Sequence, residues 1–159
     1  MKFDDLIRAA SMMGTLAHEE TERVEQVNIR GFVGIQDMEG IGLEHVKLLS
    51  NLSGISKYVR QSKLFPLSPK GAHLLNMPSI IRYLFNFVTA LQDEKMRGRN
   101  VVHKPGDLTK LHEAVGREIL PIEYGGTNGT LEGVTAYWKN EVEQHRDWLL
   151  QWNKYFYIT

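Results

Sequence analysis

Short apolar runs alternate with segments of helical periodicity through the middle of the chain, and this alternation limits the possible folds more than any other feature. The apolar runs occupy residues 31–37, 70–76 and 99–103, and each is followed by a segment whose apolar residues recur every three or four positions. A strand, a crossover helix and a second parallel strand need a right-handed connection with the helix packed on the sheet. The sequence therefore predicts an α/β fold with helices covering the sheet.

Capping and turn residues set the expected helix boundaries. Pro78 suits the first turn of a helix, Gly98 suits its end, and Asp107 suits an N-cap. Residues 120–126 contain proline and two glycines and predict an irregular segment. Helices are expected over residues 3–20, 42–50, 52–62 and 79–97, after Asp107, and along a last stretch from Trp138 to Phe156.

Length, charge and the missing cysteines exclude several classes of protein. The chain has 159 residues, the size of one domain, with 19 Lys plus Arg against 19 Asp plus Glu. This balance gives no general attraction to nucleic acid, so no nucleic-acid partner is expected. The absence of cysteine excludes disulfides and thiolate chemistry and favours a reducing compartment. We expect no targeting segment, and the most apolar stretch, residues 80–91, is shorter than the roughly 18–20 residues that span a bilayer.

Few residues are spaced for catalysis or metal binding. No two of the six histidines stand four positions apart, as two metal ligands on one helix face would, so each is expected to be structural or on the surface. Asp37 and Glu39 follow the first predicted strand, where two carboxylates can divide acid and base roles. Acidic residues in this position also stabilise turns and cap helices, and this structural interpretation is favoured.

The helix expected over residues 79–97 combines a broad apolar face with a basic end. Such a face is typical of a core helix, and the same residue types line cavities for apolar ligands. Lys95, Arg97 and Arg99 follow the apolar part, and Lys104 lies beyond the next predicted strand. These cations fit either a solvated helix end or contact with an anionic membrane or a phosphorylated head group.

Five short segments carry a family resemblance: Gly31–Gly40 (GFVGIQDMEG), Lys63–Leu67 (KLFPL), His73–Pro78 (HLLNMP), Asp93–Arg97 (DEKMR) and Ile119–Gly126 (ILPIEYGG). Together, and in this order, they resemble the CRAL-TRIO lipid-binding domain family, most of all its tocopherol-transfer and retinaldehyde-binding branch. The resemblance implies a mixed β-sheet covered by helices. It also implies a hydrophobic pocket closed by a mobile gate helix, which matches residues 78–97.

The resemblance assigns a pocket and a head-group site by position. The implied pocket residues are Phe32, Gln36, Phe65, Leu67, Leu84, Phe87 and Val88. Gln36 stands where similar relatives carry an apolar aromatic residue, which implies a different ligand or one with a polar head group. The implied phosphoinositide-binding residues are Lys70, Lys95, Arg97 and Arg99. Lys95 and Arg99 match family positions, and Lys70 lies two residues from a third matched position, Ser68.

The resemblance also predicts how the chain is organised. Residues 1–130 are expected to form the lipid-binding domain, and residues 131–159 an amphipathic helix packed on it. Family members carry a first sheet strand and a helical domain ahead of the segment that matches Phe3, so we expect a shortened form. Loss of a strand leaves a sheet edge open to further pairing.

The expected function is non-enzymatic binding and transfer of a tocopherol-, retinoid- or phospholipid-like ligand, with phosphoinositide-assisted release. The expected partners are a hydrophobic lipid and, transiently, an anionic membrane surface. No cofactor or metal is expected, and the expected location is the cytoplasm with peripheral membrane association. Two alternatives stay open: an interaction module that uses Trp138, Trp148 and Trp152, which could equally fill the core, and a small hydrolase or isomerase that uses Asp37 and Glu39.

Overall fold

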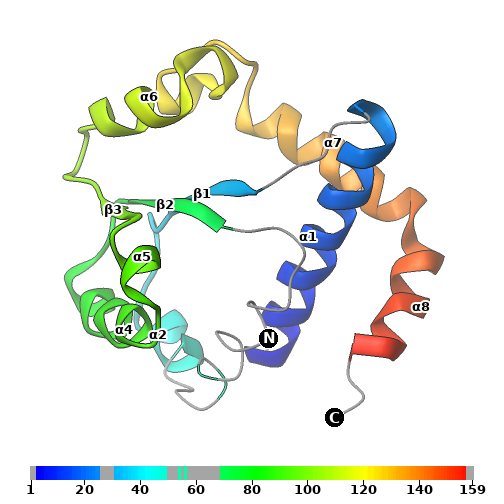
Figure 1. Ribbon diagram of the computed structural model, residues 1–159, viewed down its shortest axis with the longest axis horizontal. Coiled ribbons are helices and arrows are strands. Elements are labelled where there is room, and N and C mark those ends of the chain that lie inside the picture. The colour runs from blue at the N-terminus through cyan, green and yellow to red at the C-terminus, as the bar shows by residue number, and fades with distance from the viewer. Residues whose placement is uncertain (1–2, 26–30, 50–53, 55, 57–68, 157–159) are drawn as a thin grey trace. The chain divides into compact units, whose positions relative to one another are not determined.

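The computed structural model describes residues 3–25, 31–49, 54, 56 and 69–156 (Figure 1). Its described strands are β1 (Phe32–Asp37), β2 (Pro69–Leu75) and β3 (Asn100–Val102). Its described helices are α1 (Phe3–Glu25), α2 (Leu43–Leu49), α4 (Ser79–Ala90), α5 (Glu94–Arg97), α6 (Thr109–Val115), α7 (Leu131–Gln144) and α8 (Arg146–Phe156), with short 3-10 helices η1 (Arg117–Ile119) and η2 (Ile122–Tyr124). The predicted α/β class is confirmed. The helix expected over 52–62 lies outside the described residues except for residues 54 and 56.

The chain divides into two compact units. The first contains Met1–Asp4 and Ile29–Leu111, and it holds the sheet with α2, α4 and α5. The second contains Asp5–Asn28 and His112–Thr159, and it holds most of α1 together with η1, η2, α7 and α8. Both units bury apolar side chains: Leu74, Leu75 and Ile81 in the first, and Leu16, Leu120 and Leu149 in the second.

β2 is the centre of the sheet that the described strands form, and β1 and β3 pair with it in parallel (Figure 1). β2 has one extra residue, Lys70, opposite the step from Phe32 to Val33. Aligned residues share a face of the sheet, and side chains alternate between faces along a strand. Two rows therefore lie on one face: Gly34, Ala72 and Asn100 in one, and Gln36, Leu74 and Val102 in the other.

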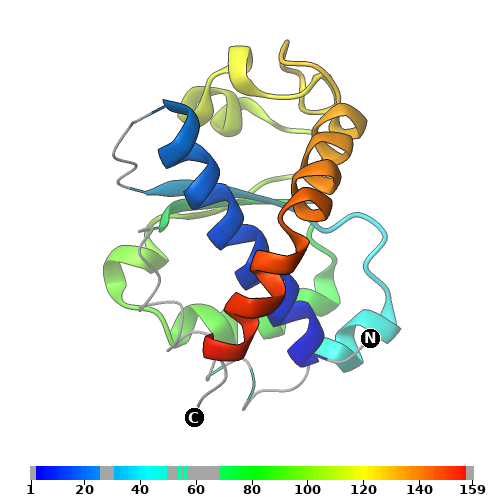
Figure 2. The same cartoon turned by 90° about the vertical axis from the view of Figure 1, so that its right-hand side faces the viewer.

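A side-chain hydrogen bond identifies which face of the sheet looks toward α4 and α5. The Asn100 amide nitrogen Nδ2 donates to Gln92 Oε1 at 2.8 Å, and Gln92 lies between α4 and α5. Both rows described above point to this side, which we call the α4 face. The helices α2, α4 and α5 all lie on this side of the sheet (Figures 1 and 2), as right-handed crossovers between neighbouring parallel strands require.

The helix predicted over residues 79–97 is two helices, which corrects the sequence prediction. The backbone amides of Leu91 and Gln92 donate to carbonyls three residues back, and this tightened turn ends α4. Asp93 then begins α5, because its Oδ1 accepts the amide of Met96 at 2.9 Å. Apolar periodicity alone does not reveal this internal N-cap.

Two other helix boundaries differ from the prediction. α1 continues to Glu25, past the end expected near residue 20. The last predicted helix is divided at His145, whose φ of −96° and ψ of 14° depart from helical values. Trp138 therefore lies on α7, whereas Trp148 lies on α8.

The proline- and glycine-rich segment after α6 is irregular, as predicted, but it is tightly hydrogen-bonded. Its long-range backbone bonds join Thr127 to Arg117, Asn128 to Leu120 and Ile122 to Gly129, each at 2.9 Å. Leu120 is buried within this segment. Gly126 packs so closely against Leu120 that a Cβ atom at residue 126 would overlap the Leu120 carbonyl group. The segment is therefore a rigid turn that requires glycine at this position.

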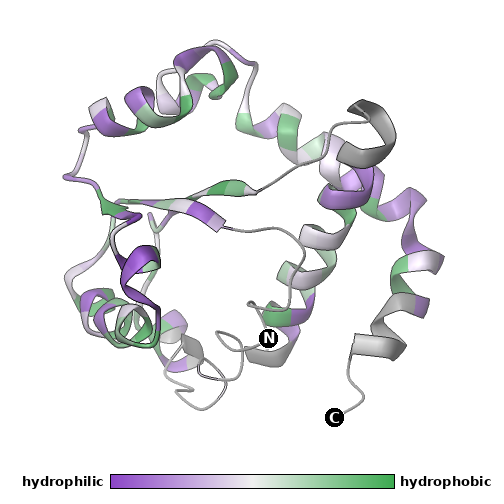
Figure 3. Ribbon diagram, viewed as in Figure 1, coloured by the Kyte–Doolittle hydropathy of each residue, from purple (hydrophilic) through white to green (hydrophobic). Residues whose placement is uncertain are grey.

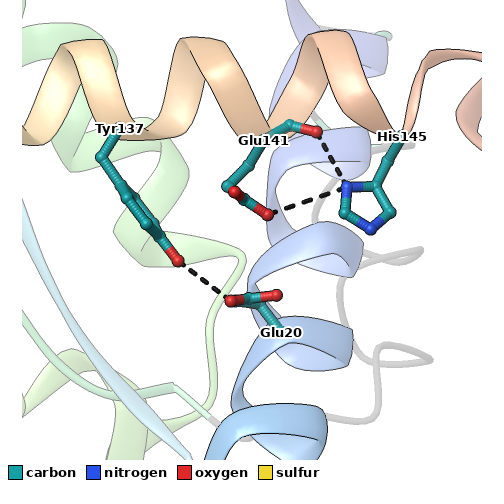
Figure 4. A network of polar contacts seen from close by, with 4 residues as sticks. All are labelled: Glu20, Tyr137, Glu141 and His145. Carbon is teal, nitrogen blue, oxygen red and sulfur yellow. Dashed lines mark hydrogen bonds and ion pairs between the residues drawn. The ribbon is translucent and has the colours of Figure 1, made fainter.

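Two glutamates are buried within the second unit, one on α1 and one on α7 (Figure 4). Tyr137 donates its hydroxyl hydrogen to Glu20 Oε1 at 3.0 Å. Glu141 is 7% exposed, and its Oε2 has no hydrogen-bond partner but lies 3.8 Å from His145 Nδ1. A buried carboxylate without a donor costs stability unless a charged partner compensates it. The two glutamates therefore differ in how well the fold supports them.

We predict that Gly126→Ala strongly destabilises the protein, because the added methyl group has no space beside Leu120. Overpacking of this kind costs about 1–3 kcal/mol or more. Gly133→Ala is the matched control: it lies on α7 with ordinary contact to Thr130, and alanine should gain about 1 kcal/mol there. Thermal unfolding compares the two variants, and equal melting temperatures would contradict the prediction.

The two buried glutamates give a second prediction. Tyr137→Phe removes a donor from the Glu20 carboxylate and should lower the free energy of unfolding by about 1–3 kcal/mol. Glu141→Met replaces a poorly supported carboxylate with an apolar side chain of similar size and should leave stability unchanged or raise it. Urea denaturation at neutral pH measures both. A loss for Glu141→Met as large as that for Tyr137→Phe would refute this account of Glu141.

Candidate functional site

The described pocket residues of β1 lie on the α4 face of the sheet. Phe32, Gly34 and Gln36 are two positions apart along β1, so all three point to this face. Phe32 is 46% exposed and Gln36 is exposed, whereas Leu74 on the same face is buried. A Cβ atom added to Gly34 would meet nothing nearer than the Gly71 carbonyl oxygen at 4.0 Å, so residue 34 has room for a methyl group on this face. Two further predicted pocket residues, Phe65 and Leu67, and the matched position Ser68 lie outside the described residues.

The inner side of α4 supplies the second set of predicted pocket residues. Leu84 and Val88 follow Ile81 at three- and four-residue spacing, so these side chains share one side of the helix. Ile81 is buried, and Leu84 and Val88 are half-buried. Phe87 is also half-buried, but it lies about 100° around the helix from Val88. The structure therefore groups Leu84 with Val88 and places Phe87 at the margin of this side.

The exposed apolar residues of α4 adjoin the side that holds Leu84 and Val88, and we call this exposed part the outer side of α4. Ile80 is 43% exposed, Tyr83 is 82% exposed and Leu91 follows at the end of the helix with 37% exposed. Figure 3 shows hydrophobic positions along α4, whereas α5 is mostly hydrophilic. Exposed apolar residues gathered on one helix are typical of an interaction surface. No described helix is long and apolar enough to cross a membrane.

The structure brings the predicted head-group cations to the amino ends of β2 and β3. Lys95 and Arg97 lie in the last turn of α5, which packs against β2. The Arg99 guanidinium nitrogen Nη1 donates to the Pro69 carbonyl at 3.1 Å, which holds Arg99 next to Lys70. We call the group formed by Lys70, Lys95, Arg97 and Arg99 the basic edge.

The four cations of the basic edge are accompanied by two exposed carboxylates, Asp93 and Glu94, at the start of α5. Lys70, Lys95 and Arg97 are exposed, and none of them forms an ion pair with a carboxylate in the part of the chain that the structure describes. Arg99 is half-buried and held by its bond to a neutral carbonyl. Lys104 lies beyond the opposite end of β3, so it does not belong to this edge.

Asp37 stabilises a turn at the other end of the sheet. Its Oδ1 accepts the Glu39 backbone amide at 3.0 Å and the Asn76 side-chain amide at 2.9 Å. Asn76 has a φ of 50°, a left-handed conformation that asparagine adopts more readily than most residues. These bonds join the end of β1 to the turn that precedes α4. They support the structural interpretation of Asp37 over the catalytic one.

Two histidines that are 30 residues apart form a buried pair that no sequence motif indicates. His73 Nδ1 lies 2.9 Å from His103 Nε2, and the two residues are 4% and 9% exposed. Burial, followed by repulsion from His103, lowers the pKa of His73 below its ordinary value. Each histidine stands among apolar residues of a predicted strand, which signals burial, but their pairing depends on the register of β2 and β3.

Two of the three tryptophans have described side chains, and they lie on separate helices. Trp138 is half-buried with its ring edge-on to Tyr137, and Trp148 is 36% exposed. The side chain of Trp152 lies outside the described residues. In the described ranges, no three His, Asp or Glu side chains come together in a group that could hold a metal ion.

Comparison with known proteins identifies the family. Residues 1–126 match the sequence profile of the CRAL/TRIO domain. Alpha-tocopherol transfer protein-like proteins of Mus musculus and Homo sapiens are each 31% identical to this chain over 129 residues, which is 77% of this chain and 35% of each relative. Clavesin-1 of Rattus norvegicus is 29% identical over 126 residues, 79% of this chain and 34% of that protein. The chain thus spans about a third of the length of these relatives. Since the profile covers most of its residues, the chain belongs to the CRAL/TRIO domain family.

Proposed function

We propose that this chain binds a hydrophobic lipid between α4 and the α4 face of the sheet, and carries it between membranes without changing it chemically. The observation that carries the proposal is that α4, whose Leu84 and Val88 are half-buried, lies on the same side of the sheet as Phe32, Gly34 and Gln36 of β1. Removing apolar ligand surface from water contributes roughly 25 cal/mol per Å². Membership of the CRAL/TRIO family supports this proposal.

The ligand class follows from the side chains around this space. Phe32, Leu84, Phe87 and Val88 suit an isoprenoid or acyl chain, as in a tocopherol-, retinoid- or phospholipid-like molecule. Gln36 is the polar exception on β1, and its amide can donate to or accept from a hydroxyl or head group. Carriage needs no catalytic group, and the bonding of Asp37 in a turn favours carriage over hydrolysis.

We further propose that the outer side of α4 and the basic edge meet a membrane together. Ile80, Tyr83 and Leu91 would enter the interface, while the basic edge would bind phosphoinositide head groups and assist release. Such contact is peripheral and transient, which suits a cytoplasmic carrier. Each cation near an anionic membrane surface contributes about 1 kcal/mol.

Filling the proposed pocket should abolish lipid binding. We predict that the wild-type chain, incubated with phospholipid vesicles and repurified, carries one lipid per chain in native mass spectrometry. Val88→Trp should reduce this bound fraction at least tenfold, because the larger ring occupies the ligand's space. Val134→Trp, at an exposed position of α7, is the matched control and should bind like the wild type. A wild-type chain without lipid, or a folded Val88→Trp variant with full occupancy, would contradict the proposal.

Removing cations from the basic edge should weaken binding to anionic membranes. We predict that Lys95→Ala/Arg97→Ala loses about 2 kcal/mol, roughly 30-fold in affinity, for vesicles that contain phosphatidylinositol bisphosphate. Lys110→Ala/Lys139→Ala removes the same charge from exposed positions elsewhere and should have little effect. Vesicle co-sedimentation at low and high salt measures both variants. Equal losses for the two double variants would show that only net charge matters.

A further inference from the structure

The buried pair of His73 and His103 has no role in the proposed lipid carriage. His73 is central in β2, and His103 directly follows β3, so the pair bridges two neighbouring strands. Both side chains point to the face opposite the α4 face, because His73 alternates with Ala72 and His103 alternates with Val102. The two ring centres are 5.1 Å apart. After His103 the chain turns toward α6, which begins at Thr109 (Figure 1).

The hydrogen bonds limit how many protons the pair can hold. His103 Nδ1 lies 3.1 Å from the Asp107 carbonyl oxygen, which only accepts, so this nitrogen carries a hydrogen. With both rings neutral, His103 Nε2 is an acceptor and His73 Nδ1 donates to it. A first added proton binds His73 Nε2 and preserves this bond. A second would bind His103 Nε2, which sets two N–H groups and two positive charges against each other at 2.9 Å and breaks the bond.

One described carboxylate near the pair attracts positive charge on His103. Hydrogen bonds from Thr109 lower the pKa of Asp107, and attraction to the nearby His103 and Lys104 lowers it further. This exposed carboxylate does not remove the conflict inside the pair, because two protonated rings would still set two N–H groups against each other at 2.9 Å. Lys104 itself repels an imidazolium. On β1, the residue aligned with His73 is the apolar Ile35.

The nearest β1 carboxylate on the same face also gives little help to the pair. Asp37 aligns with Leu75 of β2, so β2 separates it from His103, which follows β3. The Asp37 carboxylate accepts hydrogen bonds from Glu39 and Asn76. The hydrogen bonds of its own turn therefore already stabilise the charge of Asp37. The contact between the two rings therefore limits how much positive charge the pair can hold.

We infer that the His73–His103 pair is a proton-binding joint that holds β2, β3 and the start of α6 together with at most one added proton, and separates when both imidazoles are charged. Burial of His73 acts in the same direction, since it disfavours even the first proton. The folded pKa of His73 lies below its value in the unfolded chain, about 6.5. The stabilisation is therefore present above about pH 6.5 and is lost as the pH falls through the folded pKa.

Separation of the two histidines would also alter the proposed lipid space, because β2 borders both. Ala72 and Leu74 flank His73 in sequence and point to the α4 face, so loss of β2–β3 pairing displaces the floor of that space. Lipid is then retained at neutral pH and released on acidification. This consequence rests on the proposed function, whereas the joint itself does not.

The joint is tested by the pH dependence of unfolding in the full chain. His73→Asn keeps a hydrogen-bonding group near the Nδ1 position, and its amide can either donate to or accept from His103 without titrating. His45→Asn is the matched control, because His45 is exposed and its Nδ1 accepts the Gly42 amide at 3.1 Å. Urea denaturation between pH 8 and pH 4.5 gives the unfolding constant of each protein.

In the wild type and in His45→Asn, the unfolding constant should rise up to about tenfold per pH unit below pH 6.5, and more slowly in His73→Asn. The same pH dependence in all three proteins would overturn the joint. If His73→Asn does not fold, nitrogen NMR of the wild-type imidazoles decides. A hydrogen on His103 Nδ1 and delayed protonation of the pair support the joint, while two rings that titrate independently near pH 6.5 in the intact fold refute it.

Lipid release gives the second readout, with a fluorescent NBD-labelled phosphatidylcholine as the probe. The pH is lowered from 7.5 to 5.5, and the rate of probe release is measured at both values. This shift should accelerate release at least fivefold more in the wild type than in His73→Asn. A probe that fails to bind at either pH would count against the proposed function, while the unfolding data would still decide the joint. Binding at pH 7.5 with an unfolding profile unaffected by His73→Asn would refute the joint and leave the proposed function standing.

Discussion

Parallel pairing of β2 with both of its neighbours is the constraint on which the rest of the first unit depends. The register decides which side chains share a face, and a shift of one residue would exchange the two faces of a strand. As paired, β2 sends Ala72 and Leu74 toward α4 and His73 to the opposite face. One strand thus separates an apolar surface from a buried polar pair. A displacement of β2 caused on one face therefore moves the side chains on the other face as well.

The break between α4 and α5 determines where the cations of α5 lie. Had the helix continued to Arg97, its cations would have followed the direction of α4. The Asp93 cap starts a new helix that packs against β2, which places Lys95 and Arg97 near Arg99 and Lys70. The net charge of zero therefore conceals a local concentration of positive charge beside an apolar helix.

The parts of the fold that depend on local sequence were predictable, and the parts that depend on distant partners were not. Apolar runs located β1, β2 and β3, and spacing placed Leu84 and Val88 on one side of α4. Apolar periodicity could not reveal the Asp93 cap, because periodicity is read from many apolar positions, whereas the cap depends on one polar side chain. The contact of Glu20 with Tyr137 joins residues 117 positions apart, so it depends on tertiary packing. The basic edge was indicated by family resemblance, and only the hydrogen bond of Arg99 to Pro69 shows how two of its members meet.

Photo-crosslinking tests most directly whether a lipid lies between α4 and the α4 face of the sheet. A phospholipid with a diazirine in its acyl chain would be loaded into the full chain, irradiated, and its adducts located by peptide mass spectrometry. We expect adducts on the peptides that contain Phe32, Leu84 and Val88, with loss of these adducts in the presence of excess unlabelled lipid. Adducts confined to exposed apolar positions such as Ile119 and Ile122, or adducts that excess lipid does not displace, would contradict it.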